Sequence, residues 1–229
     1  MWLTRSAMAT SGPKRIVAPE PPTWLSQTAL HLAKVSNTWF RFSPKRYPSP
    51  IFWSRQGIYR FDSPDARWGV CYLASSIVGA LLEVFGDKIS HRKPLDWKEI
   101  EQRSVWLVRT PNTLRGFELF NENLSVIGAT LQCFVSSYSK SQRWGAALMR
   151  HPADLETLVY MGRKSGAPCL AMLGNSDNQR AYQSLLQTQC LGALPDWEGL
   201  WTTLDRFHVR LSSMPASRKR TRGWATPED

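Results

Sequence analysis

A buried strand followed at once by a helix constrains the fold of this chain more than any other feature. Gly69–Ala74 is a compact apolar run of the kind that forms an interior β-strand. Ser75 or Ser76 can cap a helix over Ile77 to Phe85, and Gly86 can end that helix. A strand buried on both faces needs a sheet with cover on each side, so the chain must build more than a small bundle.

Further elements follow the same patterns along the chain. Strands are predicted at Thr38–Phe42, Ser104–Arg109, Thr157–Met161 and Cys169–Leu173, with a last strand-like piece around Phe207 to Leu211. Helices are predicted at Trp24–Val35, Gln142–Arg150 and Ala181–Gln189. Strands and helices intermingle without a regular βαβ alternation. The sequence therefore predicts an α+β fold with a mixed sheet and flanking helices.

The domain boundaries are predicted from composition. Residues 1–22 are polar and proline-rich and predict a flexible arm. Residues 212–229 form a basic C-terminal tail that contains Arg218, Lys219, Arg220 and Arg222. Between them, residues 23–211 are expected to form one domain, and a hydrophobic content of 42% is enough for a single core.

The formal net charge of +11 favours a polyanionic ligand, an acidic partner or an anionic surface. Nucleic acid is one such partner, since eleven tryptophans and many arginines could stack on bases. Most of these tryptophans lie in apolar segments typical of a core, so contact with nucleic acid through the basic tail is not expected to be the main function.

The cysteines and histidines predict no metal site. Four cysteines are far apart without a CxxC pair, which fits a reducing compartment, and no histidine is followed four residues later by another candidate ligand. The N-terminus lacks the apolar core of a signal peptide, and no apolar run is long enough to span a bilayer. We expect a soluble, cytoplasmic protein without a membrane partner.

Common catalytic and nucleotide-binding motifs are missing, among them GxGxxG, GxxxxGK[ST], HExxH and GxSxG. What remains is a set of four residues, namely Arg41, Arg60, Tyr72 and Glu83. Glu83 is the only charge in an apolar helix, so a partly buried carboxylate would need a cation or a ligand hydroxyl. Each residue also has a purely structural interpretation: a solvent-facing glutamate, a core tyrosine and two surface arginines. Chemistry requires that they converge.

The same residues lie in segments that resemble successive blocks of the RES domain. These blocks are Trp39–Arg41, Gly57–Asp62, Gly69–Ala74 and Ala80–Glu83, and the resemblance extends over Trp39 to Leu173. It implies a fold similar to that of ADP-ribosyltransferases. It also implies an NAD-cleaving phosphorylase or glycohydrolase that releases nicotinamide, and a toxin that is paired with an Xre-type antitoxin. A homodimer would be in keeping with the family.

The resemblance also implies roles for particular residues. Glu83 would hold a ribose hydroxyl and stabilise positive charge as the glycosidic bond breaks. Arg41 and Arg60 would hold phosphates, either of NAD or of inorganic phosphate as a second substrate, and Tyr72 would pack on nicotinamide. Arg163 could meet a phosphate or simply be solvated. No metal is implied, because arginines would supply the charge.

One position departs from the family pattern. Gly162 stands where many RES domains have a serine, the third residue in the family name. Ser165 or one of the serines at 136, 137, 139 and 141 could replace it in space. The departure leaves three possibilities open: a weakened enzyme, a different acceptor of ADP-ribose such as a protein side chain, or a nucleotide-binding module without catalysis.

Overall fold

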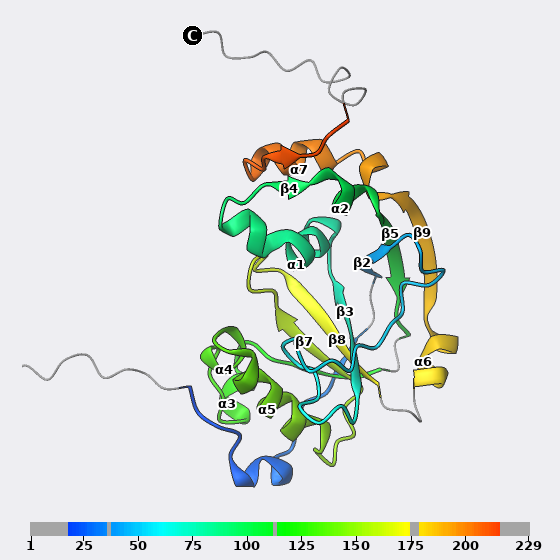
Figure 1. Ribbon diagram of the computed structural model, residues 1–229. Helices are drawn as coiled ribbons and strands as arrows, with labels where there is room; N and C mark the ends of the chain where they lie inside the picture. The colour runs from blue at the N-terminus through cyan, green and yellow to red at the C-terminus, as the bar shows by residue number, and fades with distance from the viewer. Residues whose placement is uncertain (1–17, 36–37, 112–113, 175–178, 216–229) are drawn as a thin grey trace, which may run out of the picture.

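An eight-stranded mixed sheet forms the centre of the molecule (Figure 1). The computed structural model describes residues 18–35, 38–111, 114–174 and 179–215. In spatial order the strands are β1 (Ala33–Lys34), β6 (Arg115–Glu118), β7 (Thr157–Met161), β8 (Pro168–Gly174), β3 (Gly69–Ala74), β2 (Thr38–Pro44), β5 (Arg103–Arg109) and β9 (Gln187–Ala193). Strands β6 and β7 are parallel and the other neighbours are antiparallel.

Helices flank this sheet. The described α-helices are α1 (Ile77–Ser90), α2 (Trp97–Glu101), α3 (Asn123–Val126), α4 (Gln132–Val135), α5 (Tyr138–Met149), α6 (Gln179–Leu185) and α7 (Leu200–Arg206). Short 3₁₀-helices span Thr23–Gln27 (η1) and Leu194–Asp196 (η2), and β4 (Leu95–Asp96) pairs in parallel with β10 (Leu211–Ser212). The predicted α+β fold with a mixed sheet and flanking helices is confirmed.

Four predicted elements differ from the structure. The strand-like piece expected around Phe207 to Leu211 is reduced to β10 at Leu211–Ser212, because Phe207 ends α7. The helix expected over Trp24–Val35 is wrong: η1 ends at Gln27, and Trp24 and Leu32 are exposed, so the apolar residues do not share one face. Gly86 does not end α1, which continues to Ser90; this glycine is instead a point of close approach to the Lys164 side chain. The helix predicted over Ala181–Gln189 is too long: α6 ends at Leu185, and β9 begins at Gln187.

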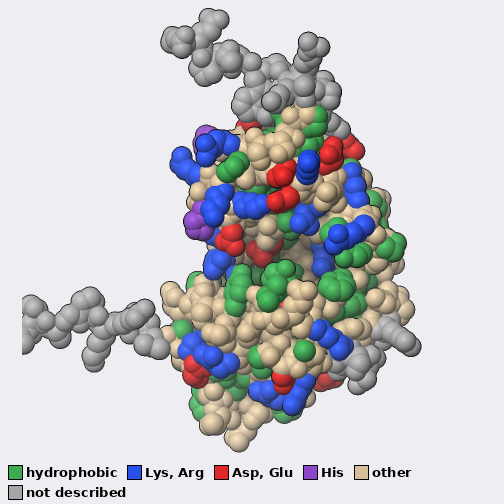
Figure 2. All heavy atoms as spheres, in the orientation of Figure 1, with side chains coloured by type: hydrophobic (Ala, Val, Ile, Leu, Met, Phe, Trp, Pro, Cys, Tyr) green, Lys and Arg blue, Asp and Glu red, His purple; other side chains and the backbone are tan. Residues whose placement is uncertain are grey.

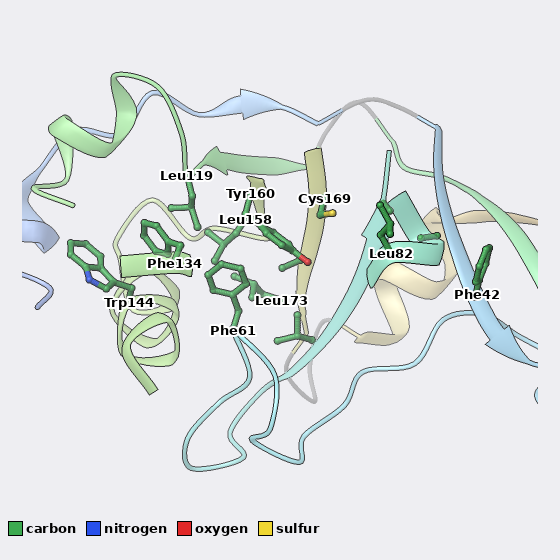
Figure 3. Packing of buried hydrophobic residues seen from close by; sticks show 14 of the residues in the cluster. Phe42, Phe61, Leu82, Leu119, Phe134, Trp144, Leu158, Tyr160, Cys169 and Leu173 are labelled. Atoms are coloured by element: carbon green, nitrogen blue, oxygen red, sulfur yellow. The ribbon is translucent and has the colours of Figure 1, made fainter. Parts of the chain in front are cut away.

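Two apolar cores lie on the two faces of the sheet. The larger one is covered by α1, α2, α4, α5 and α7, and Phe61 packs within it against Phe134 and Tyr160 (Figure 3). The smaller core lies on the opposite face, between sheet residues such as Cys71 and Met172 and covering residues that include Trp53 and, on α6, Tyr182. Alternation along β3 therefore sends Tyr72 to the larger core and Cys71 to the smaller.

The sheet is almost divided between β2 and β3. Seven residues of β2 pair with β5, but only Phe40 pairs with β3, at Ala74. Beyond that point the strands separate, and Ser54 from the loop after β2 pairs with Val70 instead. A strand pair that opens after one bridge leaves room for a cavity in the middle of the sheet.

The last five residues of the predicted arm are attached to the domain. Ala18 is buried, the Pro19 carbonyl accepts a hydrogen bond of 3.1 Å from Trp144 Nε1, and Glu20 pairs with Lys140 and Arg143. The remainder of the arm (residues 1–17) and most of the basic tail (residues 216–229) lie outside the described residues. No helix in the described ranges is both long and apolar enough to cross a membrane.

Candidate active site

A cavity of about 480 Å³ opens where β2 and β3 separate. Its lining comes from β2, β3, the loop after β2 and the cleft-facing side of α1, with single residues from β5, α5 and β7. Arg41, Arg60, Tyr72 and Glu83 all line it. Figure 2 shows a hollow near the middle of the face, with acidic and basic side chains along one edge and apolar side chains along the other. The structure thus brings four of the five predicted site residues into one cleft.

Glu83 is held at the inner side of this cleft by α1. Ser76 begins that helix, since its hydroxyl accepts a hydrogen bond of 2.9 Å from the backbone N–H of Gly79. The helix directs the Glu83 carboxylate to Tyr160 on β7, whose hydroxyl donates to Oε2 at 3.3 Å. The side chain of Glu83 is exposed, but to the cleft that it lines.

The surroundings of Glu83 act on its pKa in opposite directions. Desolvation by the cleft walls raises the pKa of the carboxyl above its ordinary value, and the Arg60 guanidinium acts against this. Arg60 is buried beneath Tyr160, with its guanidinium 5.0 Å from the ring centroid, and donates a hydrogen bond of 3.3 Å to the Met161 carbonyl. Arg60 is therefore the cation that favours ionised Glu83.

The loop that carries Arg60 is fixed by a buried carboxylate. Asp62 is fully buried and accepts hydrogen bonds from the backbone N–H groups of Ile58 and Tyr59 at 3.2 and 3.1 Å. The Tyr72 hydroxyl donates to Asp62 at 3.0 Å and accepts from the N–H of Phe61 at 2.9 Å. Since the hydroxyl of Tyr72 is engaged there, its ring is the part that lines the cleft.

Arg41 enters the cleft from the opposite face of the sheet. Arg41 is two residues after Trp39 on β2, so its side chain points to the same face of the sheet, that of the smaller core. There the guanidinium contacts the Cys71 thiol and the Phe52 carbonyl. It makes no ion pair with any described residue. The opening between β2 and β3 allows Arg41 to line the same cavity as Tyr72.

Arg163 lies at the rim rather than in the cleft. Its guanidinium contacts Asp87 at 3.3 Å and lies 5.9 Å from the ring centroid of Tyr138, and both of these residues line the cavity. Lys164 also pairs with Asp87, at 3.0 Å. Asp87 is thus shared by two cations at the cleft entrance.

Gly162 leaves a space that a neighbouring serine fills. A Cβ atom at position 162 would lie 2.8 Å from Glu83 Oε1 and 3.0 Å from Cys169 Sγ, and would collide with Ser165 Oγ. The β7–β8 turn closes through hydrogen bonds between Gly162 and Ala167 and between Gly166 and Gly162, which returns Ser165 to this point. Burial, with Glu83 nearby, raises the pKa of the Cys169 thiol to about 12, so this thiol stays protonated beside the carboxylate.

Sequence reasoning missed several cleft residues, among them Tyr59, Asp87, Arg103, Tyr138 and Tyr160. The Tyr160 signal was present, since a tyrosine inside a predicted buried strand needs a partner for its hydroxyl. Nothing in the sequence indicated that Arg103 lines a site, because a charged residue at the start of a strand is ordinary. Within the described ranges, no three His, Cys, Asp or Glu side chains gather as a metal site.

The chain is similar to known proteins both in its sequence pattern and in its structure. The model of the family described as RES domain matches residues 35–193, a range that contains all five predicted site residues. In structure, the chain is similar to a chain of the M. tuberculosis MbcT–MbcA toxin–antitoxin complex, with a TM-score of 0.59 and 15% identity, over 79% of this chain and 98% of that one. No curated protein sequence matches this chain.

Proposed function

This chain belongs to the RES domain family, and on that premise we propose that it cleaves NAD, releases nicotinamide and acts as the toxin of a toxin–antitoxin pair. The observation that carries the proposal is the convergence of Glu83, Arg60, Tyr72 and Arg41 on one cleft. The similarity in fold to a chain of a toxin–antitoxin complex supports the toxin role.

Glu83 is the residue on which the reaction depends. Cleavage breaks the bond between ribose C1 and the nicotinamide nitrogen, and the electron pair leaves with nicotinamide. Positive charge then develops on the ribose, and a carboxylate close to it lowers the barrier by electrostatic stabilisation. Arg60 favours the ionised form of Glu83 and Tyr160 donates to one of its oxygens, so both residues support this role.

Arg41 and Tyr72 bind the parts of NAD that do not react. The guanidinium of Arg41 has no anionic partner among the described residues, and its planar donors suit a phosphate. The Tyr72 ring offers a flat apolar surface to nicotinamide, since its hydroxyl is occupied by Asp62. A new C–O bond to ribose C1 completes the reaction. It forms with an oxygen of inorganic phosphate in a phosphorylase, or with water, which loses a proton, in a glycohydrolase.

An antitoxin would act by covering the cleft. Exposed apolar side chains surround its opening, namely Phe52, Tyr59, Val84 and Tyr138, with Ile58 next to them. Aromatic side chains with apolar neighbours are typical of protein-binding surfaces. A polypeptide bound there would exclude NAD from Glu83.

The experiment is incubation of the purified protein with NAD, with and without inorganic phosphate, and measurement of nicotinamide release by chromatography. Glu83→Gln is expected to lower the rate by about 100-fold or more, as for the loss of one preorganised charge-stabilising group. Glu122→Gln is the matched control, because Glu122 is an exposed glutamate outside the cleft. Equal release by wild type and Glu83→Gln would contradict the proposal.

A binding module without catalysis is the second candidate, and Gly162 favours it because the family serine is missing there. The two candidates differ in one measurement. A folded wild-type protein that binds ADP-ribose but releases no nicotinamide would be a binding module. A protein that transfers ADP-ribose from labelled NAD to a protein acceptor would instead be an ADP-ribosyltransferase.

A further inference from the structure

Arg103 is a cation in the cleft without a partner of opposite charge. It begins β5 and lines the cavity, and its guanidinium lies 5.4 Å from the ring centroid of Phe85 on α1. Its Nε is buried, and no acceptor for it occurs among the described residues. In the same part of the chain the Arg103 guanidinium makes no hydrogen bond and no ion pair, so all five of its N–H donors lack a protein acceptor.

This environment is unfavourable for a lone cation. Desolvation lowers the pKa of Arg103, and the Glu99 carboxylate and Tyr59 counteract it only partly and through space. Glu99 is already paired with Lys88 at 2.5 Å. Burying Nε without a hydrogen bond costs free energy that a bound anion would offset.

The carboxylates that line the cleft cannot supply that anion. Glu83 faces Arg60, and Asp87 is paired with Lys164 and Arg163. Arg41 also has no anionic partner among the described residues. The cleft therefore contains two guanidiniums, Arg41 and Arg103, whose charge no described carboxylate neutralises.

The strand register separates these two guanidiniums. Arg41 pairs with Trp106 and Arg103 with Pro44, so they are three residues apart along the β2–β5 pair, or on the order of 10 Å between backbones. An odd offset also sends their side chains to opposite faces of the pair. The two side chains therefore enter the cavity from different faces of the strand pair, so Arg103 can meet negative charge at a different point of a ligand from Arg41.

We propose that Arg103 is a second phosphoryl-binding residue of the cleft, separate from Arg41. The planar donors of the guanidinium suit phosphoryl oxygens. The phosphoryl group comes either from a diphosphate-bearing nucleotide or from free phosphate bound beside it. The inference rests on the proposed function for the identity of that nucleotide.

The test measures binding rather than turnover. Calorimetry gives the Kd of ADP-ribose, of inorganic phosphate and of adenosine for wild type, Arg103→Gln, Arg103→Lys and Arg109→Gln. Arg109→Gln is the matched control, since Arg109 is exposed at the other end of β5 and outside the cleft. Arg103→Gln is expected to raise the Kd of ADP-ribose by about 10-fold or more, Arg103→Lys by less, and neither changes the affinity for adenosine.

The outcomes distinguish the two sources of the phosphoryl group and show whether Arg103 binds one at all. Loss of ADP-ribose affinity assigns the ligand's own phosphate to Arg103, and loss of inorganic phosphate binding alone assigns free phosphate. Wild-type affinity of Arg103→Gln for both probes, or no binding of either by wild type, overturns the inference. Arg103→Gln should also unfold at no lower temperature than wild type, whereas an arginine needed only for packing would lower it. Binding that depends on Arg103 in a protein that releases no nicotinamide refutes the proposed function and leaves this inference standing.

Discussion

At the scale of single residues, the ionisation of Glu83 predicts how the rate of the proposed NAD cleavage depends on pH. Cleft walls raise the pKa of Glu83 and Arg60 opposes that shift. In the proposed reaction the carboxylate is the active form, so NAD cleavage should fall as pH decreases through a pKa above the ordinary 4.5 of glutamate. The stability of the fold depends on pH in the opposite sense. The stabilising contribution of protonated Glu83 is fully present below the ordinary pKa and is lost as pH rises through the pKa of the folded state.

Arg60→Gln tests this balance. Without the Arg60 cation, the pKa of Glu83 rises further, so the acidic limb of the rate profile should move to higher pH than in wild type. The measurement is the rate of nicotinamide release across pH in both proteins, with buffer and ionic strength held constant. An acidic limb that stays at the same pH in the variant would show that Arg60 does not control Glu83.

Gly162→Ala should damage the site without straining the backbone. The new Cβ would lie 2.8 Å from Glu83 Oε1 and would displace Ser165, so we expect kcat to fall by about 10-fold or more, as misplacement of a catalytic group does. Gly166→Ala is the contrast, since Gly166 has a φ of +62° and open space around its Cβ position.

Gly166→Ala should therefore lose about 1 kcal/mol of stability through backbone strain and keep its kcat. Kinetic assays and urea unfolding of both variants distinguish the two effects. Full activity of Gly162→Ala would mean that Glu83 and Ser165 have more room than the structure gives them.

The site residues found from sequence share one property. Arg41, Arg60, Tyr72 and Glu83 lie in short blocks with a recognisable order, and all four line the cavity. Arg103 reaches the cleft only because β5 pairs with β2 in one register, and Asp62 matters only because a loop folds over it. Such residues depend on contacts between distant segments, which no local pattern encodes.

At the scale of elements, α1 depends on its first turn. Ser76 accepts a hydrogen bond from the Gly79 N–H, so Ser76→Ala should lower the free energy of unfolding by about 1 kcal/mol, the usual cost of losing an N-cap. Ser75→Ala is the matched control, because only the backbone N–H of Ser75 has a described role, as a donor to Pro168. Equal urea midpoints for the two variants would mean that the cap contributes nothing.

How accurately the sequence predicts a strand depends on how deeply that strand is buried. Strands β3, β7 and β8 are buried on both faces, so their apolar runs predicted them almost to the residue. Strand β9 is an edge strand whose first five residues are exposed, and its glutamines and threonine carry no period-2 pattern. The two-residue strands β4 and β10 exist only because they pair with each other, which is a tertiary effect.

At the scale of the whole molecule, residues 18–22 attach the start of the described chain to the larger core beside α5. Pro19 accepts from Trp144, and Glu20 pairs with Lys140 and Arg143 on α5. These ion pairs are exposed, so most of the benefit comes from the buried Ala18 and from the Trp144 hydrogen bond.

Two truncations measure this contribution. A chain that lacks residues 1–22 should be about 1–3 kcal/mol less stable than one that lacks residues 1–17, from the lost hydrogen bonds to Ala18 and Pro19 and lost burial. Chemical unfolding of both truncated proteins gives the difference directly. Identical stability would mean that the contacts of residues 18–22 do not persist in solution.

The order in which the chain is made bears on when the cleft can exist. Glu83 meets Tyr160, a residue 77 positions later, so the carboxylate is synthesised well before its surroundings. At a translation rate of about 5–20 residues per second, the delay is roughly 4–15 s. Strand β3 likewise waits for β8 before the centre of the sheet can close. Under the proposed function, a nascent chain has no formed active site for several seconds, and an antitoxin translated alongside it would have that interval to bind the protein first.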